Sequence, residues 1–513
     1  MFSSIYSAAV TGMEVVPVQV EADVSDGLPV FSMVGYVNSQ VKETQDRVRT
    51  ALHNKRLGLP AKRITVNLAP GDVRKEGTGY DLPVALCILT ALGRIPGKYL
   101  QGVMAAGELG LDGRVKGIWG ILPMVQKARE AGCQVCLVPR ENEKEGRLIE
   151  DIRVVGVKDI AEAVEWLRQG RPMQDNKEPE HVETELESPE ETVDFSDIRG
   201  QEGAVRATLI AAAGMHNLLY IGSPGSGKSM MARRIPGILP PLAREESLEL
   251  TKIYSIAGLL SKDHPVIQKR PFRSPHHTIS PQALAGGGRS PRPGEITLAH
   301  NGVLFLDELP EFSRKSLEIL RQPLEDRCVY ISRVQGTYVF PAGCMLAAAM
   351  NPCACGYYPD LGRCRCTPSE VKRYLGKLSG PLLDRVDVCV DIREPTYAQM
   401  AQSGRGISSE ELRRKVIQAQ RVQEKRYQGT DIRFNSQLDG RNVEDYCVMT
   451  EGSRQWMERI YTKLRLSPRA YHRIIKVSRT IADLDQSELI EDIHVQEAYG
   501  YRMAQGGVYD SIY

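Results

Sequence analysis

Gly222–Ser229 reads GSPGSGKS and directly follows the apolar run Leu218–Ile221. These eight residues match G-x-x-x-x-G-K-[ST], the phosphate-binding loop that joins a strand to a helix. Glycines let successive backbone N–H groups turn toward an anion, and the positive end of the helix dipole adds to the attraction. We expect Lys228 to reach the β- and γ-phosphates of ATP and Ser229 to hold Mg²⁺. The predicted nucleotide-binding residues are Gly222, Ser223, Pro224, Gly225, Ser226, Gly227, Lys228 and Ser229.

Two further apolar runs end in polar residues that suit the same site. Val303–Leu306 precedes Asp307 and Glu308. Met345–Met350 precedes Asn351. Buried parallel strands deliver the residues that follow them to the carboxyl edge of the sheet, beside the phosphate loop. We expect Asp307 to complete the Mg²⁺ shell, Glu308 to polarise the attacking water and Asn351 to sense the γ-phosphate. The sequence therefore predicts an α/β fold that carries an ATP-hydrolysing site.

The composition describes a chain of several domains without a membrane segment. Its 513 residues suffice for roughly three or four domains. No stretch approaches the ~18 consecutive apolar residues of a membrane span. No Lys or Arg precedes Lys42, so the N-terminus lacks the basic start of a signal peptide. We expect a cytoplasmic protein with no membrane partner, whose eleven cysteines are thiols or metal ligands and not disulfides.

The charges are distributed unevenly, although the net charge is only +2. Between Gln174 and Asp194, nine acidic residues stand against one basic residue, Lys177, so the remainder of the chain has a net charge of +10. An acidic stretch with two prolines and few apolar residues is typical of a solvated linker. The positive remainder permits a nucleic-acid partner, but scattered surface Lys and Arg explain it equally well.

The linker separates parts of the chain that differ in pattern. Before it, strand-like runs such as Arg63–Leu68 alternate with predicted amphipathic helices such as Val41–Lys55. After the phosphate-loop region the pattern is helical, and Ser408 and Ser467 are predicted helix caps. The expected parts are a first domain over residues 1–170, the acidic linker over 171–194, the α/β core over 195–394 and a helical lid over 395–513.

Four long segments sharpen the prediction. They are RPFRSPHHTISPQALAGGG (Arg270–Gly288), PGEITLAHNGVLFLDELPEF (Pro293–Phe312), AAMNPCACGYY (Ala348–Tyr358) and SGPLLDRVDV (Ser379–Val388). They resemble the AAA+ ATPases of the magnesium-chelatase-like branch and, within it, the bacterial ComM/YifB family. The resemblance covers nearly the whole chain. It implies that Arg385 is the arginine finger that enters the neighbouring subunit's site and that Arg469 is the second sensor of the lid. Sites shared between subunits imply a ring, in this class usually a homohexamer.

The segment Cys328–Phe340 alternates toward a Gln335-Gly336 turn and predicts a β-hairpin. In the resembled AAA+ branch, an insertion at this place is a hairpin that faces the central pore. Arg333 would then lie near the tip and could contact a DNA phosphate. An exposed arginine on a surface hairpin is the competing interpretation.

Four of the eleven cysteines lie within fourteen residues: Cys353, Cys355, Cys364 and Cys366. A C-x-C pair on each side of a Gly- and Tyr-containing loop predicts a tetrahedral zinc site of structural type, because four thiolates leave no open position. An iron–sulfur cluster or free thiols are the alternatives. The neighbouring histidines His276 and His277 are interpreted as structural, because adjacent side chains are expected to diverge.

The first domain resembles the Lon-type protease domain and, still more, the related domain of the RadA recombination protein. The segments that carry this resemblance are Val41–Lys55, Arg63–Leu86 and Gly107–Leu122. Lon enzymes use a serine activated by a lysine. Their positions fall on Gly79 and Leu122 here, and the adjacent Thr78 has no matched lysine. We therefore expect no proteolysis, and a role in ring assembly or in DNA contact, with Arg74 and Lys75 as candidates for the contact.

Three functions remain open from sequence. The first is a DNA motor of the ComM kind that moves branched or recombining DNA, as in branch migration during natural transformation. The second is a motor subunit that inserts metal into a porphyrin, against which the Lon-like domain and the four-cysteine loop argue. The third is a protein remodeller or regulatory scaffold.

Overall fold

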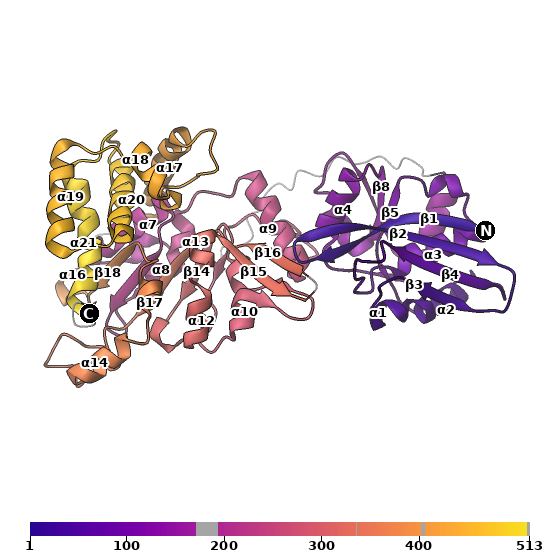
Figure 1. Ribbon diagram of the computed structural model, residues 1–513, viewed down its shortest axis with the longest axis horizontal. Helices are drawn as coiled ribbons and strands as arrows, with labels where there is room; N and C mark the ends of the chain where they lie inside the picture. The colour runs from indigo at the N-terminus through magenta and orange to yellow at the C-terminus, as the bar shows by residue number, and fades with distance from the viewer. Residues whose placement is uncertain (171–192, 335, 402–405, 510–513) are drawn as a thin grey trace. The chain divides into compact units, whose positions relative to one another are not determined.

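The computed structural model describes residues 1–170, 193–334, 336–401 and 406–509. The chain forms two compact units, each built on a sheet of its own (Figure 1). All but the last two residues of the predicted acidic linker lie outside the described part of the chain. Within that part, no helix is both long and apolar enough to cross a membrane.

The first unit contains a seven-stranded mixed sheet in the order β3-β4-β2-β1-β5-β8-β9. The strands are β1 (Phe2–Thr11), β2 (Glu14–Ser25), β3 (Phe31–Val34), β4 (Arg63–Ala69), β5 (Val103–Ala105), β8 (Val135–Pro139) and β9 (Arg153–Val157). The long pair β1 and β2 is antiparallel, whereas β5, β8 and β9 run parallel to one another. A separate short hairpin joins β6 (Glu108–Leu109) and β7 (Val115–Lys116).

Helices bury the apolar side chains of this sheet. They are α1 (Ser39–Lys42), α2 (Thr44–Asn54), α3 (Asp81–Ala91), α4 (Ile121–Glu130), α5 (Glu143–Gly146) and α6 (Ile160–Arg168). Every residue of α3 is buried, so this helix forms the centre of the core. The helix predicted over Val41–Lys55 is interrupted at Glu43, because Asn38 caps a separate first turn.

Helix α9 (Arg244–Ala257) belongs to the first unit, although it follows the phosphate loop in sequence. Residues 244–267 and 289–292 are grouped there by their contacts. The Ser255 hydroxyl donates to Glu145 Oε1 at 2.5 Å, and the backbone N–H of Gly120 donates to the Ser255 carbonyl at 3.1 Å. The expected domain limits stay predictions. These contacts show that α9 packs with the first unit, although its place in the sequence is within the expected α/β core.

The second unit contains a five-stranded sheet, entirely parallel, in the order β11-β14-β17-β10-β18. The strands are β11 (Phe272–Arg273), β14 (Val303–Leu306), β17 (Met345–Met350), β10 (Leu218–Gly222) and β18 (Val388–Ile392). The residues of β14 and β17 are all buried, and those of β10 and β18 are buried except Gly222 and Asp391, as expected for a parallel sheet covered on both faces. The three strands predicted around the nucleotide site are confirmed, and so is the α/β fold class.

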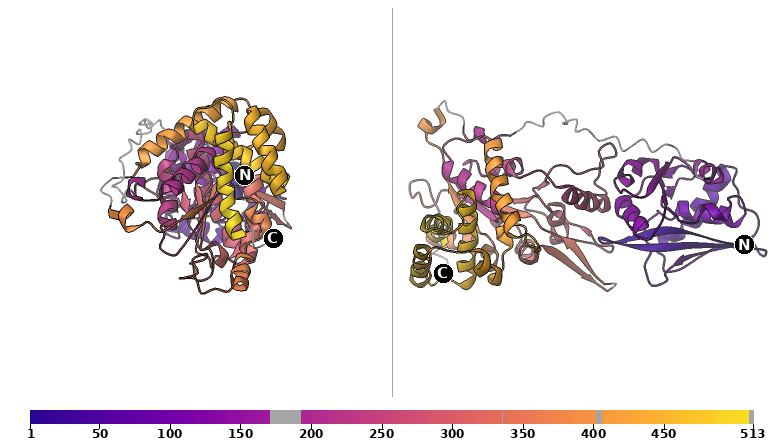
Figure 2. Two further views of the ribbon diagram at one scale, coloured as in Figure 1. Left: turned by 90° about the vertical axis from the view of Figure 1, so that its left-hand side faces the viewer. Right: turned by 90° about the horizontal axis from the view of Figure 1, so that it is seen from above.

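The remaining helices cover this sheet and form the C-terminal part (Figure 2). They are α7 (Glu202–Gly214), α8 (Lys228–Ile238), α10 (Pro281–Ala285), α11 (Glu295–Leu298), α12 (Arg314–Ile319), α13 (Pro323–Asp326), α14 (Pro368–Leu375), α15 (Gly380–Leu383), α16 (Tyr397–Ala401), α17 (Ser409–Arg426), α18 (Gly440–Tyr446), α19 (Glu451–Leu464), α20 (Pro468–Leu484) and α21 (Asp492–Tyr509). Ser408 and Ser467 cap α17 and α20, as predicted, by accepting a backbone N–H three residues on.

A hairpin of β15 (Cys328–Arg333) and β16 (Gly336–Pro341) extends from the second unit (Figure 1). Val329 and Ile331 are buried, whereas Tyr330 and Ser332 are exposed. The antiparallel pairing of the two strands confirms the predicted hairpin, whereas Gln335 of the predicted turn lies outside the described residues. The short strands β12 (Gly286–Gly287) and β13 (Arg292–Pro293) lie elsewhere in the chain.

A buried polar network ties the C-terminal helices to the second unit's core. Asp483 on α20 is fully buried and accepts from Arg426, Arg479 and Asn435. Asn435 also donates to Thr480 Oγ1 at 2.9 Å, and that hydroxyl contacts His216 Nε2 at 2.7 Å. The network thus reaches from α20 to the turn that precedes β10. Burial is tolerated here because the carboxylate faces two guanidinium groups.

Replacing Asp483 by Ala should lower the free energy of unfolding by about 3–5 kcal/mol, because two arginines would lose their buried partner. Urea unfolding followed by circular dichroism measures the change. Glu458→Ala on α19 removes an exposed carboxylate and should shift the free energy by less than about 0.5 kcal/mol. Equal effects of the two substitutions would contradict the assigned role of the network.

Candidate functional site

The phosphate loop connects the end of β10 to the start of α8 and folds as its sequence requires. Gly225 and Gly227 adopt φ of +78° and +96°, which side chains with a Cβ rarely adopt. Gly222 has another constraint, because a Cβ there would lie 2.4 Å from the Ile392 carbonyl oxygen of the adjacent strand β18. The Ser226 hydroxyl is buried without a hydrogen-bond partner in the described structure. Such an unpaired group in a glycine-rich loop fits a site for a polar ligand.

Lys228 is the first residue of α8, and its side chain is almost completely buried. Its ammonium group donates to the carbonyl oxygens of Gly222 and Ser223, both at 2.8 Å, and to Asn351 Oδ1 at 3.1 Å. Burial lowers the pKa of Lys228, while the nearby Asp307 and Glu308 carboxylates act in the opposite direction. The structure therefore brings Lys228, at the start of α8, together with Asn351, which follows β17.

Asp307 follows β14 and faces the phosphate loop. The Ser229 hydroxyl donates to Asp307 Oδ2 at 2.6 Å, so the two predicted Mg²⁺ ligands touch. Asp307 Oδ1 accepts the backbone N–H of Glu308 at 2.9 Å. Oxygen donors of this kind suit Mg²⁺. A magnesium ion here would be held between the loop and the carboxyl edge of the sheet.

Glu308 adopts a left-handed backbone conformation, with φ of +52°. This conformation is strained for a residue with a side chain, and such strain is concentrated at functional sites. The side chain is 58% exposed, and its Oε2 lies 3.3 Å from Nδ1 of His277. The proposed catalytic carboxylate therefore has a histidine partner that the sequence did not reveal.

The expectation that His276 and His277 diverge is wrong. Their ring centroids lie 4.0 Å apart with an interplanar angle of 34°. The alternation of neighbouring side chains applies to strands, whereas these residues lie in an irregular segment between β11 and α10. His276 Nδ1 lies 2.9 Å from the Thr278 hydroxyl. Only His277 faces the acidic residue, so the two histidines have different partners.

Arg385 and Arg469 meet on one carboxylate, that of Glu325 on α13. Arg385 Nη2 forms a close ion pair with Glu325 Oε2, and Arg469 Nη2 lies 3.7 Å from Oε1. Arg385 also donates to the Pro381 carbonyl at 2.7 Å, while its Nε is buried without a partner. Within the described residues, neither arginine contacts the phosphate loop. Glu325 was not singled out from sequence, because it lies 60 residues from Arg385.

Arg333 ends β15 and is exposed. Its guanidinium group donates to the Gly288 carbonyl at 3.3 Å and to the Ser332 carbonyl at 3.4 Å. In the described part of the chain no carboxylate neutralises this charge, so the group is available to an anion.

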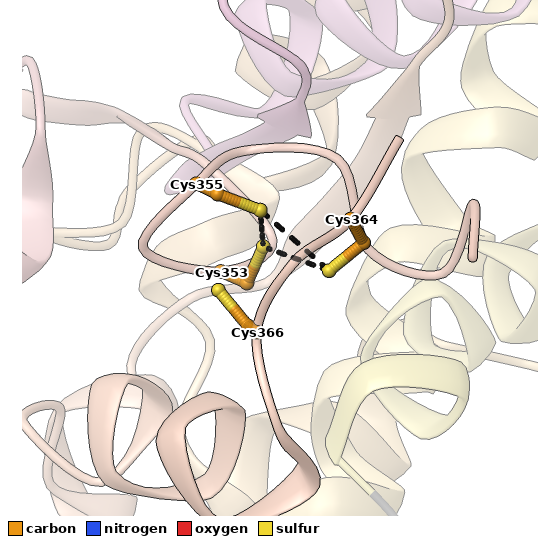
Figure 3. Close-up of side chains that lie close together, drawn as sticks. All are labelled: Cys353, Cys355, Cys364 and Cys366. Carbon is orange, nitrogen blue, oxygen red and sulfur yellow. Dashed lines mark hydrogen bonds between the residues drawn. The ribbon is translucent and has the colours of Figure 1, made fainter. Parts of the chain in front are cut away.

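The four predicted metal ligands converge. The sulfurs of Cys353, Cys355, Cys364 and Cys366 point toward one another (Figure 3), and all lie within 4.8 Å. Cys353 is buried and accepts the backbone N–H groups of Gly356 and Tyr358 at 3.2 and 3.4 Å. Hydrogen bonds from the backbone N–H groups of Arg365 and Tyr357 lower the pKa of Cys355 to about 6, which favours the thiolate of that residue. Although a backbone hydrogen bond to each of Cys364 and Cys366 acts to lower its pKa, burial and the neighbouring thiols raise both pKa values. The donor set fits a tetrahedral thiolate-binding cation.

The first unit contains Gly79 and Leu122, the positions at which the Lon dyad is expected. Leu122 is fully buried, and the Thr78 hydroxyl forms a short hydrogen bond to Glu108 Oε2. Lys75, an expected candidate for DNA contact, is also buried, and its ammonium donates to the Pro70 carbonyl. Arg74 pairs with Glu76 at 2.8 Å. Burial excludes Lys75 from contact with DNA in this conformation.

Comparison with known proteins shows to which family this chain belongs. Three family models match: "Magnesium chelatase, subunit ChlI" over residues 194–400, "Subunit ChlI of Mg-chelatase" over 20–142 and "Magnesium chelatase, subunit ChlI C-terminal" over 406–502. YifB of Salmonella typhimurium is 41% identical over 501 residues, which cover 97% of this chain and 96% of that protein. Competence protein ComM of Haemophilus influenzae is 41% identical over 499 residues, 97% of each chain.

The chain belongs to the magnesium-chelatase-like AAA+ ATPases of the ComM/YifB family. This membership confirms the resemblance and implies ATP and Mg²⁺ as ligands and assembly into an oligomer. A match to Lon protease 2 of Bacillus subtilis, 27% identical over 151 residues, covers 29% of this chain and 26% of the protease. This match supports the resemblance to Lon-type proteins.

Replacing Lys228 by Ala should weaken ATP binding by about tenfold or more, because a charge-assisted hydrogen bond to phosphate is lost. Equilibrium titration with fluorescently labelled ATP and Mg²⁺ measures the affinity. The matched control is Lys372→Ala, which removes an exposed lysine from α14. An unchanged affinity in the Lys228 variant would exclude this loop as the nucleotide site.

Proposed function

We propose that this protein is an ATP-hydrolysing ring motor that acts on DNA and moves the branches of recombination intermediates, as in natural transformation. The observation that carries the proposal is the separation of two half-sites in one chain. The phosphate loop gathers Ser229, Asp307 and Asn351, whereas Arg385 and Arg469 meet elsewhere on Glu325. A complete site then needs two subunits.

Within the first half-site, we assign each side chain one task. Gly222–Gly227 cradle the phosphates with their backbone, and Lys228 neutralises the β- and γ-phosphates. Ser229 and Asp307 hold Mg²⁺, whose charge stabilises the leaving phosphate oxygens. Glu308 accepts a proton from the attacking water, and Asn351 orients that water. The contact between Lys228 and Asn351 supports a shared position at the γ-phosphate.

We assign Arg385 as the arginine finger and Arg469 as the second sensor, both acting on the site of the next subunit in a homohexamer. Their shared ion pair with Glu325 supports this assignment, because one carboxylate keeps the two guanidinium groups close enough to reach the same phosphate. Glu325 is half exposed, so a neighbouring subunit's phosphate can compete for the two cations. The competence protein among the relatives lends support to a role in DNA uptake and recombination.

The hairpin of β15 and β16 is the proposed DNA contact. Arg333 offers a cation without an acidic partner among the described residues, and Tyr330 exposes an aromatic ring on the same strand. A cation binds the DNA backbone, and an aromatic ring can stack on an unpaired base. Both act without regard to sequence, as a motor requires.

Two further assignments complete the proposal. The four cysteines hold a structural zinc ion, which their shared centre supports. The N-terminal Lon-like domain, proposed over residues 1–170, is not a protease, because Gly79 and Leu122 provide neither nucleophile nor base. We place the protein in the cytoplasm, because its eleven cysteines are expected to be thiols or metal ligands and not disulfides. The core over 195–394 and the lid over 395–513 are kept as proposed domain limits.

ATP hydrolysis measured alone, with a four-way DNA junction and with an unfolded protein tests the function. We expect the junction to raise the rate several-fold and its arms to be exchanged. Arg333→Ala should reduce this stimulation and lower the salt dependence of DNA binding by about one ion. Arg459→Ala, which removes an exposed arginine from α19, is the control. Stimulation by the unfolded protein alone would favour a protein remodeller, and no response to DNA would reject the motor.

A further inference from the structure

The four-cysteine loop lies directly against the phosphate loop. It joins β17 to α14 and, in this fully described stretch, contains no helix or strand between Met350 and Pro368. The first glycine of this loop, Gly356, adopts φ of +89°. A Cβ on Gly356 would lie 2.4 Å from Cδ of Pro224 in the phosphate loop. The backbone of the four-cysteine loop at Gly356 therefore packs directly against Pro224 of the phosphate loop.

A second contact connects the two loops through a carboxylate. Arg363, between Cys355 and Cys364, donates to both carboxylate oxygens of Glu394 at 2.9 and 3.1 Å. The Ser223 hydroxyl of the phosphate loop donates to Glu394 Oε1 at 2.8 Å. A bidentate pair of this kind fixes orientation as well as distance. The positions of Arg363 and Ser223 are thus linked through one side chain.

The guanidinium group of Arg363 is itself fixed from within the loop. It lies over the ring of Tyr357, 4.1 Å from the centroid. Cys353, at the other end, follows the proposed sensor Asn351 by two residues, and Asn351 contacts Lys228. The loop therefore touches the nucleotide site at three points: through Gly356, through Arg363 and through Asn351.

The four sulfurs determine the path of this loop. Cys353 lies 3.4 Å from Cys355 and 3.8 Å from Cys364, across a loop without regular structure. A segment that lacks a core of its own keeps such a path when a cation links its ends. Without the cation, only weak S–H hydrogen bonds link the sulfurs. Loss of the metal would release Gly356 and Arg363 from their places.

We propose that metal in the four-cysteine site sets the conformation of the phosphate loop, with Gly356 and Arg363 as positioning residues, so that ATP affinity depends on the metal. The metal is a divalent cation that prefers thiolates, such as Zn²⁺. This inference rests on the proposed ATP and zinc sites. The competing view is that the metal stabilises only its own loop, and then nucleotide affinity is independent of it.

The test uses the full-length protein without DNA, and it measures bound zinc by mass spectrometry together with the affinity for labelled ATP. Cys364→Ser/Cys366→Ser should lose its zinc and bind ATP about tenfold more weakly, while the two cysteines nearest Asn351 stay in place. Arg363→Ala should keep its zinc and still bind ATP about three- to tenfold more weakly. This variant keeps the proposal testable if the cysteine variant unfolds.

Arg365→Ala provides the matched control, because Arg365 lies two residues away in the same loop and is exposed. It should change neither zinc content nor affinity. Normal ATP affinity in a zinc-free cysteine variant, or equal affinities of the Arg363 and Arg365 variants, would overturn the inference. Zinc retained by the cysteine variant would reject the metal site itself, and no ATP binding by the unaltered protein would reject the proposed ATPase. Of these outcomes, only the absence of ATP binding would also reject the DNA-motor proposal.

Discussion

The buried ammonium group of Lys228 lies at the centre of the candidate nucleotide site in the second unit, and the other groups of the site are arranged around it. It is held by two carbonyl oxygens of its own loop and by Asn351, and Asp307 and Glu308 are close enough to affect its pKa. A parallel sheet makes this convergence possible, because β14, β17 and β10 all end at one edge. The acidic, amide and basic groups come from distant parts of the sequence. Without the sheet order, they would not form a site for phosphate.

The same protomer presents arginines that its own phosphate loop does not contact within the described residues. Arg385 and Arg469 come from different elements and are brought together by Glu325. A carboxylate between two guanidinium groups keeps both in a defined place until a stronger anion competes. If these arginines act on the neighbouring subunit's site, as proposed, hydrolysis depends on the neighbour, which agrees with the oligomeric assembly of AAA+ ATPases. Metal in the four-cysteine loop would, in addition, set the conformation of the phosphate loop.

Much of this structure follows from local sequence patterns. The phosphate loop, the strands that precede Asp307 and Asn351, the hairpin and the caps at Ser408 and Ser467 depend on neighbours within a few residues, and all are observed. Long-range partners could not be predicted in this way. Ser223 and Glu394 are 171 residues apart, and no periodicity relates them. The contact of His277 with Glu308 depends on the path of an irregular segment. The grouping of α9 with the first unit depends likewise on packing, which local patterns do not encode.

A site completed between subunits is the central claim, and subunit mixing tests it most directly. Glu308→Gln removes the proposed base but keeps Arg385, whereas Arg385→Ala removes the finger but keeps the base. Each variant alone should hydrolyse ATP very slowly. In equal mixtures that exchange subunits, about a quarter of the interfaces would combine an intact base with an intact finger, so we expect about a quarter of the wild-type rate per site. A mixture no faster than the two separate variants, although mixed rings form, would contradict the account.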